Sequence, residues 1–187
     1  METLLPLLLA LIAAPAAMLA GTLQRSLVAL VGSVFTMLAF LATVFVWHGG
    51  GGSVDFAWAP AWDLRFAVSL DGLAALYALL ATGVGFLVLV YSSSYLSLHL
   101  EHEGRPESKK TRFYGFMLLF MGSMVGLAMA QDLILLFVFW DLTAIASYYL
   151  IGYDRHDADA RASALMALLV TGVTAVFLLI AHCPKRR

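Results

Sequence analysis

Residues 132–152 read Asp-Leu-Ile-Leu-Leu-Phe-Val-Phe-Trp-Asp-Leu-Thr-Ala-Ile-Ala-Ser-Tyr-Tyr-Leu-Ile-Gly, an apolar segment with one carboxyl group, Asp141, near its middle. A helix of about 20 residues crosses the roughly 30 Å hydrocarbon core of a bilayer. The segment therefore predicts a membrane-spanning helix over residues 133–152. Asp141 is its ninth residue and is expected close to the bilayer midplane, about 13 Å from the helix start.

The same pattern extends along the 187-residue chain, which is 62% hydrophobic and only 12% charged. Soluble domains carry about 25% charged residues. Runs without charge predict about six spanning helices in all, at 3–23, 27–47, 70–92, 113–131, 133–152 and 162–182. The expected fold class is therefore all-α integral membrane protein, with residues 1–184 as one multi-pass membrane domain.

This composition excludes several classes of protein. A soluble enzyme does not fit the low charge, and a net charge of −1 leaves no basic surface for nucleic acid. The single cysteine, Cys183, excludes a disulfide framework within one chain. Residues 3–23 are expected to be a spanning helix rather than a cleaved signal, because no Lys or Arg precedes Arg25.

The Lys and Arg residues outside the spans predict the orientation of the chain in the cell (inner) membrane. One side of the membrane receives seven of them: Arg25, Arg105, Lys109, Lys110, Arg112, Arg155 and Arg161. The other side receives four: Arg65, Lys185, Arg186 and Arg187. The positive-inside rule places the loop at 93–112 in the cytoplasm and the N-terminus on the extracytoplasmic side.

Residues 185–187 form a short basic tail on the outer side in this count, where a basic cluster is unexpected. Two hypotheses account for the tail. Either the sixth helix does not cross the membrane fully, or the tail marks the end of a truncated or frame-shifted chain.

The segment between the second and third helices has a different periodicity. Apolar and polar or small residues alternate over 54–58 and again over 64–68, on the two sides of Pro60. Alternation on both sides of a proline turn predicts a β-hairpin, and Trp47, Trp58 and Trp62 suit a place at the extracytoplasmic membrane surface. The alternative is a plain loop.

Asp141 is the candidate proton-translocation residue. A carboxylate within hydrocarbon costs several kcal/mol unless it is protonated, paired or hydrated. A carboxyl group removed from water is protonated more readily, and such an acid can take up and release a proton near neutral pH. The alternative is a structural aspartic acid that hydrogen-bonds a neighbouring helix.

Three nearby polar residues are candidate supporting groups for a proton path. Thr143 and Ser147 are four residues apart and share a helix face. Hydrogen bonds to their own helix are the favoured interpretation for both hydroxyl groups. Asp132, like Asp71, begins a helix, where capping of the exposed N–H groups is the favoured role.

The remaining motifs point to structure rather than to chemistry. A solvated loop is favoured over a metal site for the cluster of His99, Glu101, His102 and Glu103. Gly122 and Gly126 form a GxxxG pattern that predicts close helix packing. No phosphate loop and no haem or flavin motif occurs in the sequence, so no cofactor is expected.

Three stretches resemble one known family. Residues 132–152, the preceding Phe-Met-Gly-Ser-Met-Val-Gly at 120–126 and Asp-Gly-Leu-Ala-Ala-Leu at 71–76 are similar to the antiporter-like subunits of Mrp-type multisubunit Na+/H+ antiporters and of respiratory complex I. The similarity is greatest to the A subunit of the Mrp antiporters, which is close to the L subunit of complex I. It covers most of the chain from about residue 62 onward.

The resemblance implies a mechanism. Family members place a glutamate on the fifth helix, matched here by Asp141, and this acid works with lysines on later helices in a proton-conducting half-channel. Family subunits are several times longer, and no lysine falls within an expected span of this chain. We therefore expect that the chain alone does not complete transport, and that a partner subunit supplies the rest or the chain is a fragment.

Three functions follow as hypotheses. The first is a subunit, or a piece of one, of a cation (Na+)/proton antiporter: a transporter rather than an enzyme, with other membrane subunits, the lipid bilayer, H+ and Na+ as its partners. The second is a proton-pumping membrane subunit of an NADH-quinone oxidoreductase. The third is a membrane scaffold that transports nothing.

Overall fold

A computed structural model of the chain describes residues 2–24, 27–59, 64–102, 108–153 and 157–182. Its described part contains six helices that are long and apolar enough to cross a membrane. These are α1 (Leu5–Leu23), α2 (Leu27–His48), α3 (Gly72–His102), α4 (Ser108–Met129), α5 (Leu133–Ile151) and α6 (Ala158–His182), with a single 3₁₀ turn, η1 (Glu2–Leu4), before α1. The predicted six-helix membrane fold is confirmed.

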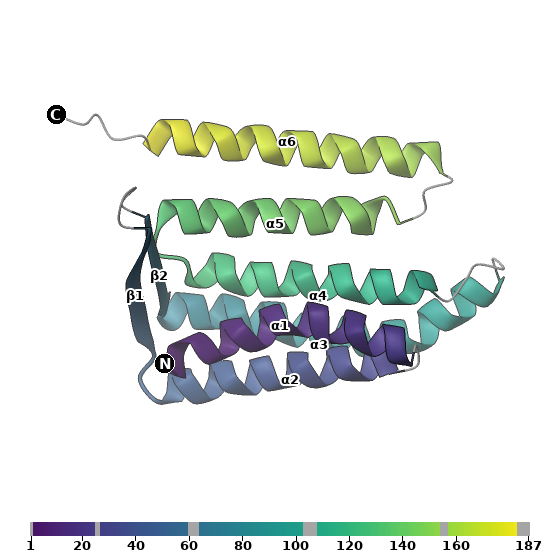
Figure 1. Ribbon diagram of the computed structural model, residues 1–187, viewed down its shortest axis with the longest axis horizontal. Coiled ribbons are helices and arrows are strands. Elements are labelled where there is room, and N and C mark those ends of the chain that lie inside the picture. Colours follow the sequence, from purple (N-terminus) through teal and green to yellow (C-terminus); the bar gives the residue numbers. More distant parts are fainter. Residues whose placement is uncertain (1, 25–26, 60–63, 103–107, 154–156, 183–187) are drawn as a thin grey trace.

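The six helices run side by side, and the hairpin lies across one end of the bundle (Figure 1). Helix α1 packs against α2 and α4, and α3 packs against the same two helices. Helix α5 lies between α4 and α6, so α6 forms the edge of the bundle that is farthest from α2 (Figure 1). The well-buried part of the molecule therefore lies around α1 and α4, whereas α5 and α6 form an outer layer.

Small residues allow the central helices to approach closely. A Cβ atom added at Gly122 of α4 would lie 2.7 Å from the backbone oxygen of Ala10 in α1. A Cβ atom at Gly126 would overlap the ring of Phe139 in α5. The predicted role of the Gly122–Gly126 pattern in close helix packing is confirmed, with α1 on one glycine and α5 on the other.

The predicted hairpin is also confirmed. Strand β1 (Gly52–Ala59) pairs antiparallel with β2 (Leu64–Leu70), and the register places Phe56 opposite Phe66 with a bulge between Ala57 and Ala59. The two phenylalanine rings stack at a centroid distance of 5.1 Å. Gln131, between α4 and α5, donates its backbone N–H to the Ala67 oxygen at 2.9 Å, which ties the hairpin to the start of α5.

Two expected boundaries are wrong. The segment 93–112 was predicted as a loop, but α3 continues to His102 and α4 already begins at Ser108. Hydropathy marks the part of a helix that lies in hydrocarbon, and a helix can continue beyond it into water or the headgroup layer. Likewise, α6 begins at Ala158 rather than at 162, because Asp157 accepts the backbone N–H of Asp159 at 2.9 Å and caps its first turn.

The basic tail at 185–187 lies outside the described residues.

Candidate functional site

The cap at Asp132 positions α5. Its carboxylate accepts the backbone N–H groups of Ile134 and Leu135 at 2.8 and 3.2 Å, as expected for a residue that precedes the first turn of a helix. The capping role of Asp71 is confirmed in the same way, by the N–H of Ala74 at 2.7 Å. Since α5 begins at Leu133 and ends at Ile151, Asp141 lies near the middle of this spanning helix.

Asp141 lies on the face of α5 that its neighbouring helices leave open. Residues 134, 138, 141 and 145 follow the helical repeat and form one stripe. Ile134, Val138 and Ile145 on this stripe are each 42–43% exposed, whereas Phe139 is 5% exposed. Asp141 is partly buried, and within the described part of the chain its carboxyl group has no hydrogen-bond or ion-pair partner.

Thr143 and Ser147 do not join Asp141. The Thr143 hydroxyl donates to the Trp140 oxygen at 2.7 Å, and the Ser147 hydroxyl donates to the Thr143 oxygen at 2.8 Å. A step of two residues along a helix turns by about 200°, so Thr143 lies on the opposite side of α5 from Asp141. The two hydroxyl groups thus make the intrahelical hydrogen bonds that the sequence favoured. Asp132 is nine residues from Asp141, about 13 Å along the helix axis.

A cavity of about 480 Å³ lies between the hairpin and the first two turns of α5. Its two polar residues are Arg65 and Asp132, and its apolar wall consists of Phe56, Phe66, Ile134, Leu135, Val138 and Phe139. Arg65 also forms an ion pair with Asp55 at 2.7 Å. Ile134 and Val138 belong to the stripe that carries Asp141, so the cavity ends about one helical turn from the carboxyl group.

Sequence reasoning missed this cavity, because its walls come from the hairpin and from α5, and the distance between the two depends on tertiary packing. The only signal in the sequence was the shared apolar character of the two segments. Among the described residues, no three His, Cys, Asp or Glu side chains are grouped closely enough to hold a metal ion. The cluster at 99–103 is outside the part of the chain whose side chains the structure describes.

Two family models match the chain and together cover more than half of it. Residues 58–114 match the model described as NADH-ubiquinone oxidoreductase (complex I), chain 5 N-terminus. Residues 130–183 match the model described as NADH:quinone oxidoreductase/Mrp antiporter, TM. The second match includes all of α5 with Asp141.

Curated relatives carry antiporter names. The chain is 37% identical over 153 residues to the A/B subunit of a probable K+/H+ antiporter of Rhizobium meliloti, a match that covers 80% of this chain and 14% of that protein. It is 41% identical over 123 residues to the A subunit of the Na+/H+ antiporter of Alkalihalophilus pseudofirmus, over 65% of this chain and 14% of the relative. The chain thus spans about a seventh of the length of these relatives.

A solved structure shows the same arrangement of helices. A chain of the Mrp complex from a Dietzia species matches 97% of this chain with a TM-score of 0.79 and 30% sequence identity. The match covers 19% of the Dietzia chain. The fold described above therefore recurs as one part of a longer chain in that complex.

Proposed function

We propose that this chain, which belongs to the family of antiporter-like membrane subunits shared by Mrp antiporters and complex I, works in a multisubunit cation/proton antiporter. It serves there as a subunit or as a piece of one. Its contribution is part of a proton path through the membrane. Asp141 is the group that takes up and releases the proton.

One observation carries the proposal. Asp141 is a carboxyl group in the middle of a spanning helix, on a face that the described helices leave open, with no partner among the described residues. An ionisable group within the membrane is costly, and such groups mark ion and proton pathways in membrane proteins. A purely structural aspartic acid would instead be expected to hydrogen-bond a neighbouring helix.

The open face of α5 is also where the rest of the assembly fits. The relatives are about seven times longer than their matched part, so further helices are available to cover the stripe of Ile134, Val138 and Ile145. A cation on such a helix would favour the charged form of Asp141. This chain has no Lys or Arg between residues 113 and 154, so the cation has to come from outside that segment.

A second candidate function is a proton-pumping membrane subunit of an NADH-quinone oxidoreductase. It is supported by the descriptions of both matching family models, which name that complex. In either case the proposed chemistry of this chain is proton transfer at Asp141.

The orientation forms part of the proposal. The six spans belong to a multi-pass membrane protein. We place it in the cell (inner) membrane, with the N-terminus and the hairpin on the extracytoplasmic side. Of the five Lys and Arg residues in the described part of the chain, only Arg65 lies in the hairpin, whereas Lys109, Lys110, Arg112 and Arg161 lie at the opposite end of the bundle. The cavity beside Arg65 and Asp132 then opens toward the extracytoplasmic side and gives the short route to Asp141.

The experiment uses everted membrane vesicles from cells that express the whole complex containing this chain. The pH gradient is formed by respiration, and its collapse on addition of Na+ or of K+ measures antiport. Asp141→Asn should reduce the rate by at least about tenfold, as loss of a proton-transferring group commonly does. Asp141→Glu keeps a carboxyl group and introduces the glutamate that the family carries on this helix, so it should retain most of the rate.

The controls separate the hypotheses. Thr143→Val changes a polar residue of the same helix that does not face Asp141, and it should leave the rate close to that of the wild type. Antiport that survives Asp141→Asn in correctly assembled complex refutes the relay. NADH-driven proton pumping without response to Na+ or K+ favours the second candidate instead.

A further inference from the structure

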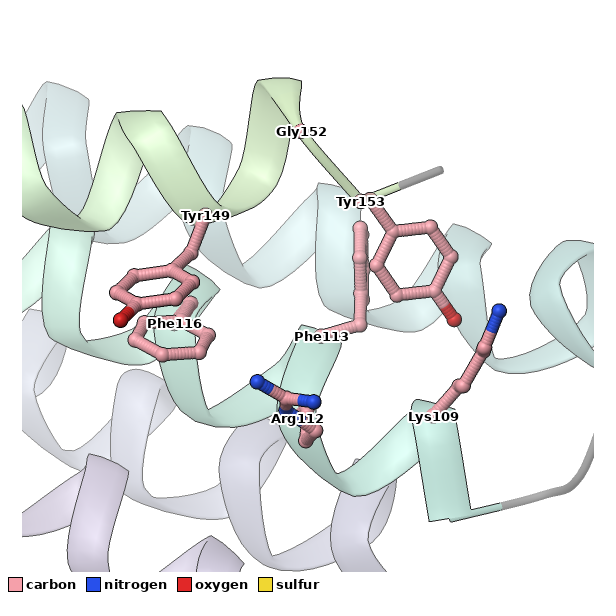
Figure 2. A pocket seen from close by; sticks show the side chains of 7 residues that line it. All are labelled: Lys109, Arg112, Phe113, Phe116, Tyr149, Gly152 and Tyr153. Atoms are coloured by element: carbon pink, nitrogen blue, oxygen red, sulfur yellow. The ribbon is translucent and has the colours of Figure 1, made fainter. Parts of the chain in front are cut away.

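A second cavity, of about 250 Å³, lies at the end of the bundle opposite the hairpin. It lies between the first turns of α4 and the last turn of α5, and Figure 2 shows its lining side chains. Four of them are aromatic, Phe113, Phe116, Tyr149 and Tyr153, and two are cationic, Lys109 and Arg112. The proton-path proposal uses none of these residues.

The aromatic side chains form an ordered wall. Phe116 of α4 stacks on Tyr149 of α5 with ring centroids 4.2 Å apart. Phe113 meets Tyr153 edge to face at 5.6 Å. Aromatic residues at the end of a spanning helix are typical of the level of the lipid headgroups. The wall is therefore suited to contact the glycerol and upper acyl region of a lipid.

The two cations lie at the same level with no described counter-charge. Lys109 is partly buried and Arg112 is exposed, and among the described residues neither forms an ion pair or a hydrogen bond. Figure 2 shows their charged ends on the two sides of the Phe113–Tyr153 pair. Lys110, between them in the sequence, does not line the cavity.

The position of these cations in the helix is unfavourable without an anion. They lie within the first five residues of α4, which begins at Ser108. The N-terminus of a helix carries a partial positive charge and disfavours nearby cations. An anion placed there would gain from both side chains and from the helix dipole. Inorganic anions in water would not gain from the apolar wall, whereas an anionic amphiphile would.

We propose that this cavity binds the phosphate headgroup of an anionic phospholipid, with Lys109 and Arg112 on the phosphate and the Phe116–Tyr149 pair against the glycerol and acyl chains. Basic cavities between spanning helices are a general way to hold anionic headgroups, and the cytoplasmic leaflet, on which the charge distribution places this end, carries such lipids. The site is independent of Asp141.

The test is native mass spectrometry of the purified complex containing the full chain, titrated in detergent with phosphatidylglycerol. Lys109→Gln combined with Arg112→Gln should weaken binding by about tenfold or more, since each removes a charge-assisted contact to the phosphate. Lys110→Gln removes the same charge from the same helix turn outside the cavity and should change binding little. Phosphatidylcholine, the zwitterionic probe, should bind weakly to all variants.

Each alternative has a distinct outcome. Equal loss of binding in Lys110→Gln would mean general attraction to a positive surface and would overturn the site. Displacement of phosphatidylglycerol by millimolar inorganic phosphate would identify a free phosphate as the ligand and contradict the lipid. The single variants Lys109→Gln and Arg112→Gln serve as a second measurement if the double variant fails to assemble, and unchanged binding in both would also overturn the proposal.

Discussion

At the scale of single residues, Asp141 is the acidic residue within α5, and its carboxyl group has no described partner. The buried indole N–H of the adjacent Trp140 also lacks a hydrogen-bond partner among the described residues. Thr143 and Ser147 satisfy their hydroxyl groups with carbonyl oxygens of their own helix. Asp132 does so with the N–H groups of the first turn. The energetic cost of placing a polar group in the membrane is therefore uncompensated at Trp140 and at Asp141. Of these two side chains only the Asp141 carboxyl group can bind and release a proton near neutral pH, so chemistry is expected there.

The double change Thr143→Val and Ser147→Ala tests this distinction. Each substitution removes one intrahelical hydrogen bond, which contributes about 0.5–1.5 kcal/mol to net stability, and leaves the face of Asp141 unchanged. We expect antiport close to the wild-type rate in everted vesicles and a small change in melting temperature. A large loss of antiport with normal assembly would show that the hydroxyl groups take part in the path.

A residue-scale test of packing uses Gly122. A methyl group at this position would lie 2.7 Å from the backbone oxygen of Ala10, which cannot move without a shift of α1. Gly122→Ala should therefore destabilise the chain by about 1–3 kcal/mol, the usual cost of overpacking. Thermal unfolding of the purified complex in detergent measures this.

Gly172→Ala is the matched control, since nothing lies within 4 Å of a Cβ atom at Gly172 in α6. Alanine is the better helix former by about 1 kcal/mol, so the control should unfold at the same or a slightly higher temperature. Equal destabilisation by the two substitutions would contradict the close contact of α1 and α4.

At the scale of elements, the hairpin connects the bundle to the start of α5. Its strands are held by the ladder, by the stacked Phe56–Phe66 pair and by the ion pair of Arg65 with Asp55. The ion pair is exposed on both sides, at 59% and 43%, so water screens it strongly. The aromatic pair is therefore expected to contribute more to hairpin stability than the charges.

Hydrogen exchange of the β1 amides in Phe56→Ala and Arg65→Gln compares the two contributions. Loss of the aromatic pair should raise exchange in β1, because such pairs contribute about 0.5–1.5 kcal/mol beyond burial. Loss of the exposed ion pair should change exchange by less. Faster exchange in Arg65→Gln than in Phe56→Ala would contradict this order and would mean that the ion pair contributes more to the stability of the hairpin than the aromatic pair does.

The sequence predicts elements better than it predicts their ends or their partners. Runs without charge locate all six helices, and alternation at 54–58 and 64–68 locates both strands, because each pattern follows from the local periodicity of the chain. The extension of α3 to His102 was missed, because hydropathy indicates which residues lie in the hydrocarbon core and not where the helix ends. The sequence places Lys109 and Arg112 in a predicted loop, where they serve only to indicate the orientation. The packing of α4 against α5 places both side chains at an aromatic cavity, and no local pattern predicts this.

At the scale of the whole molecule, the six spanning helices of the described residues and the hairpin form a layered bundle, with α5 and α6 at one edge (Figure 1). These two helices are the least buried of the six. That Asp141 lies on the open side of α5 depends on where α4 and α6 pack, which no local pattern contains. The Rhizobium meliloti relative is about seven times longer than its matched part, and we propose that the rest of such a protein packs against this edge. Proton transfer across the membrane is thus expected of the assembly and not of these helices alone.

Thiol labelling in intact cells tests the orientation of the whole molecule. In a Cys183→Ser background, Ser53→Cys in β1 should react with a membrane-impermeant maleimide, because the positive-inside rule places the hairpin outside. Ala158→Cys, at the other end of the bundle, should react only after the cells are permeabilised. The reverse pattern would invert the orientation and place the cavity beside Arg65 on the cytoplasmic side.

The most direct test of the central claim is the initial rate of Na+- or K+-dependent proton movement in vesicles that hold equal amounts of assembled wild-type and Asp141→Asn complex. We predict a rate lowered by at least about tenfold in Asp141→Asn and largely retained in Asp141→Glu. An unchanged rate in Asp141→Asn, at equal assembly, would contradict the assignment of Asp141 as the proton carrier.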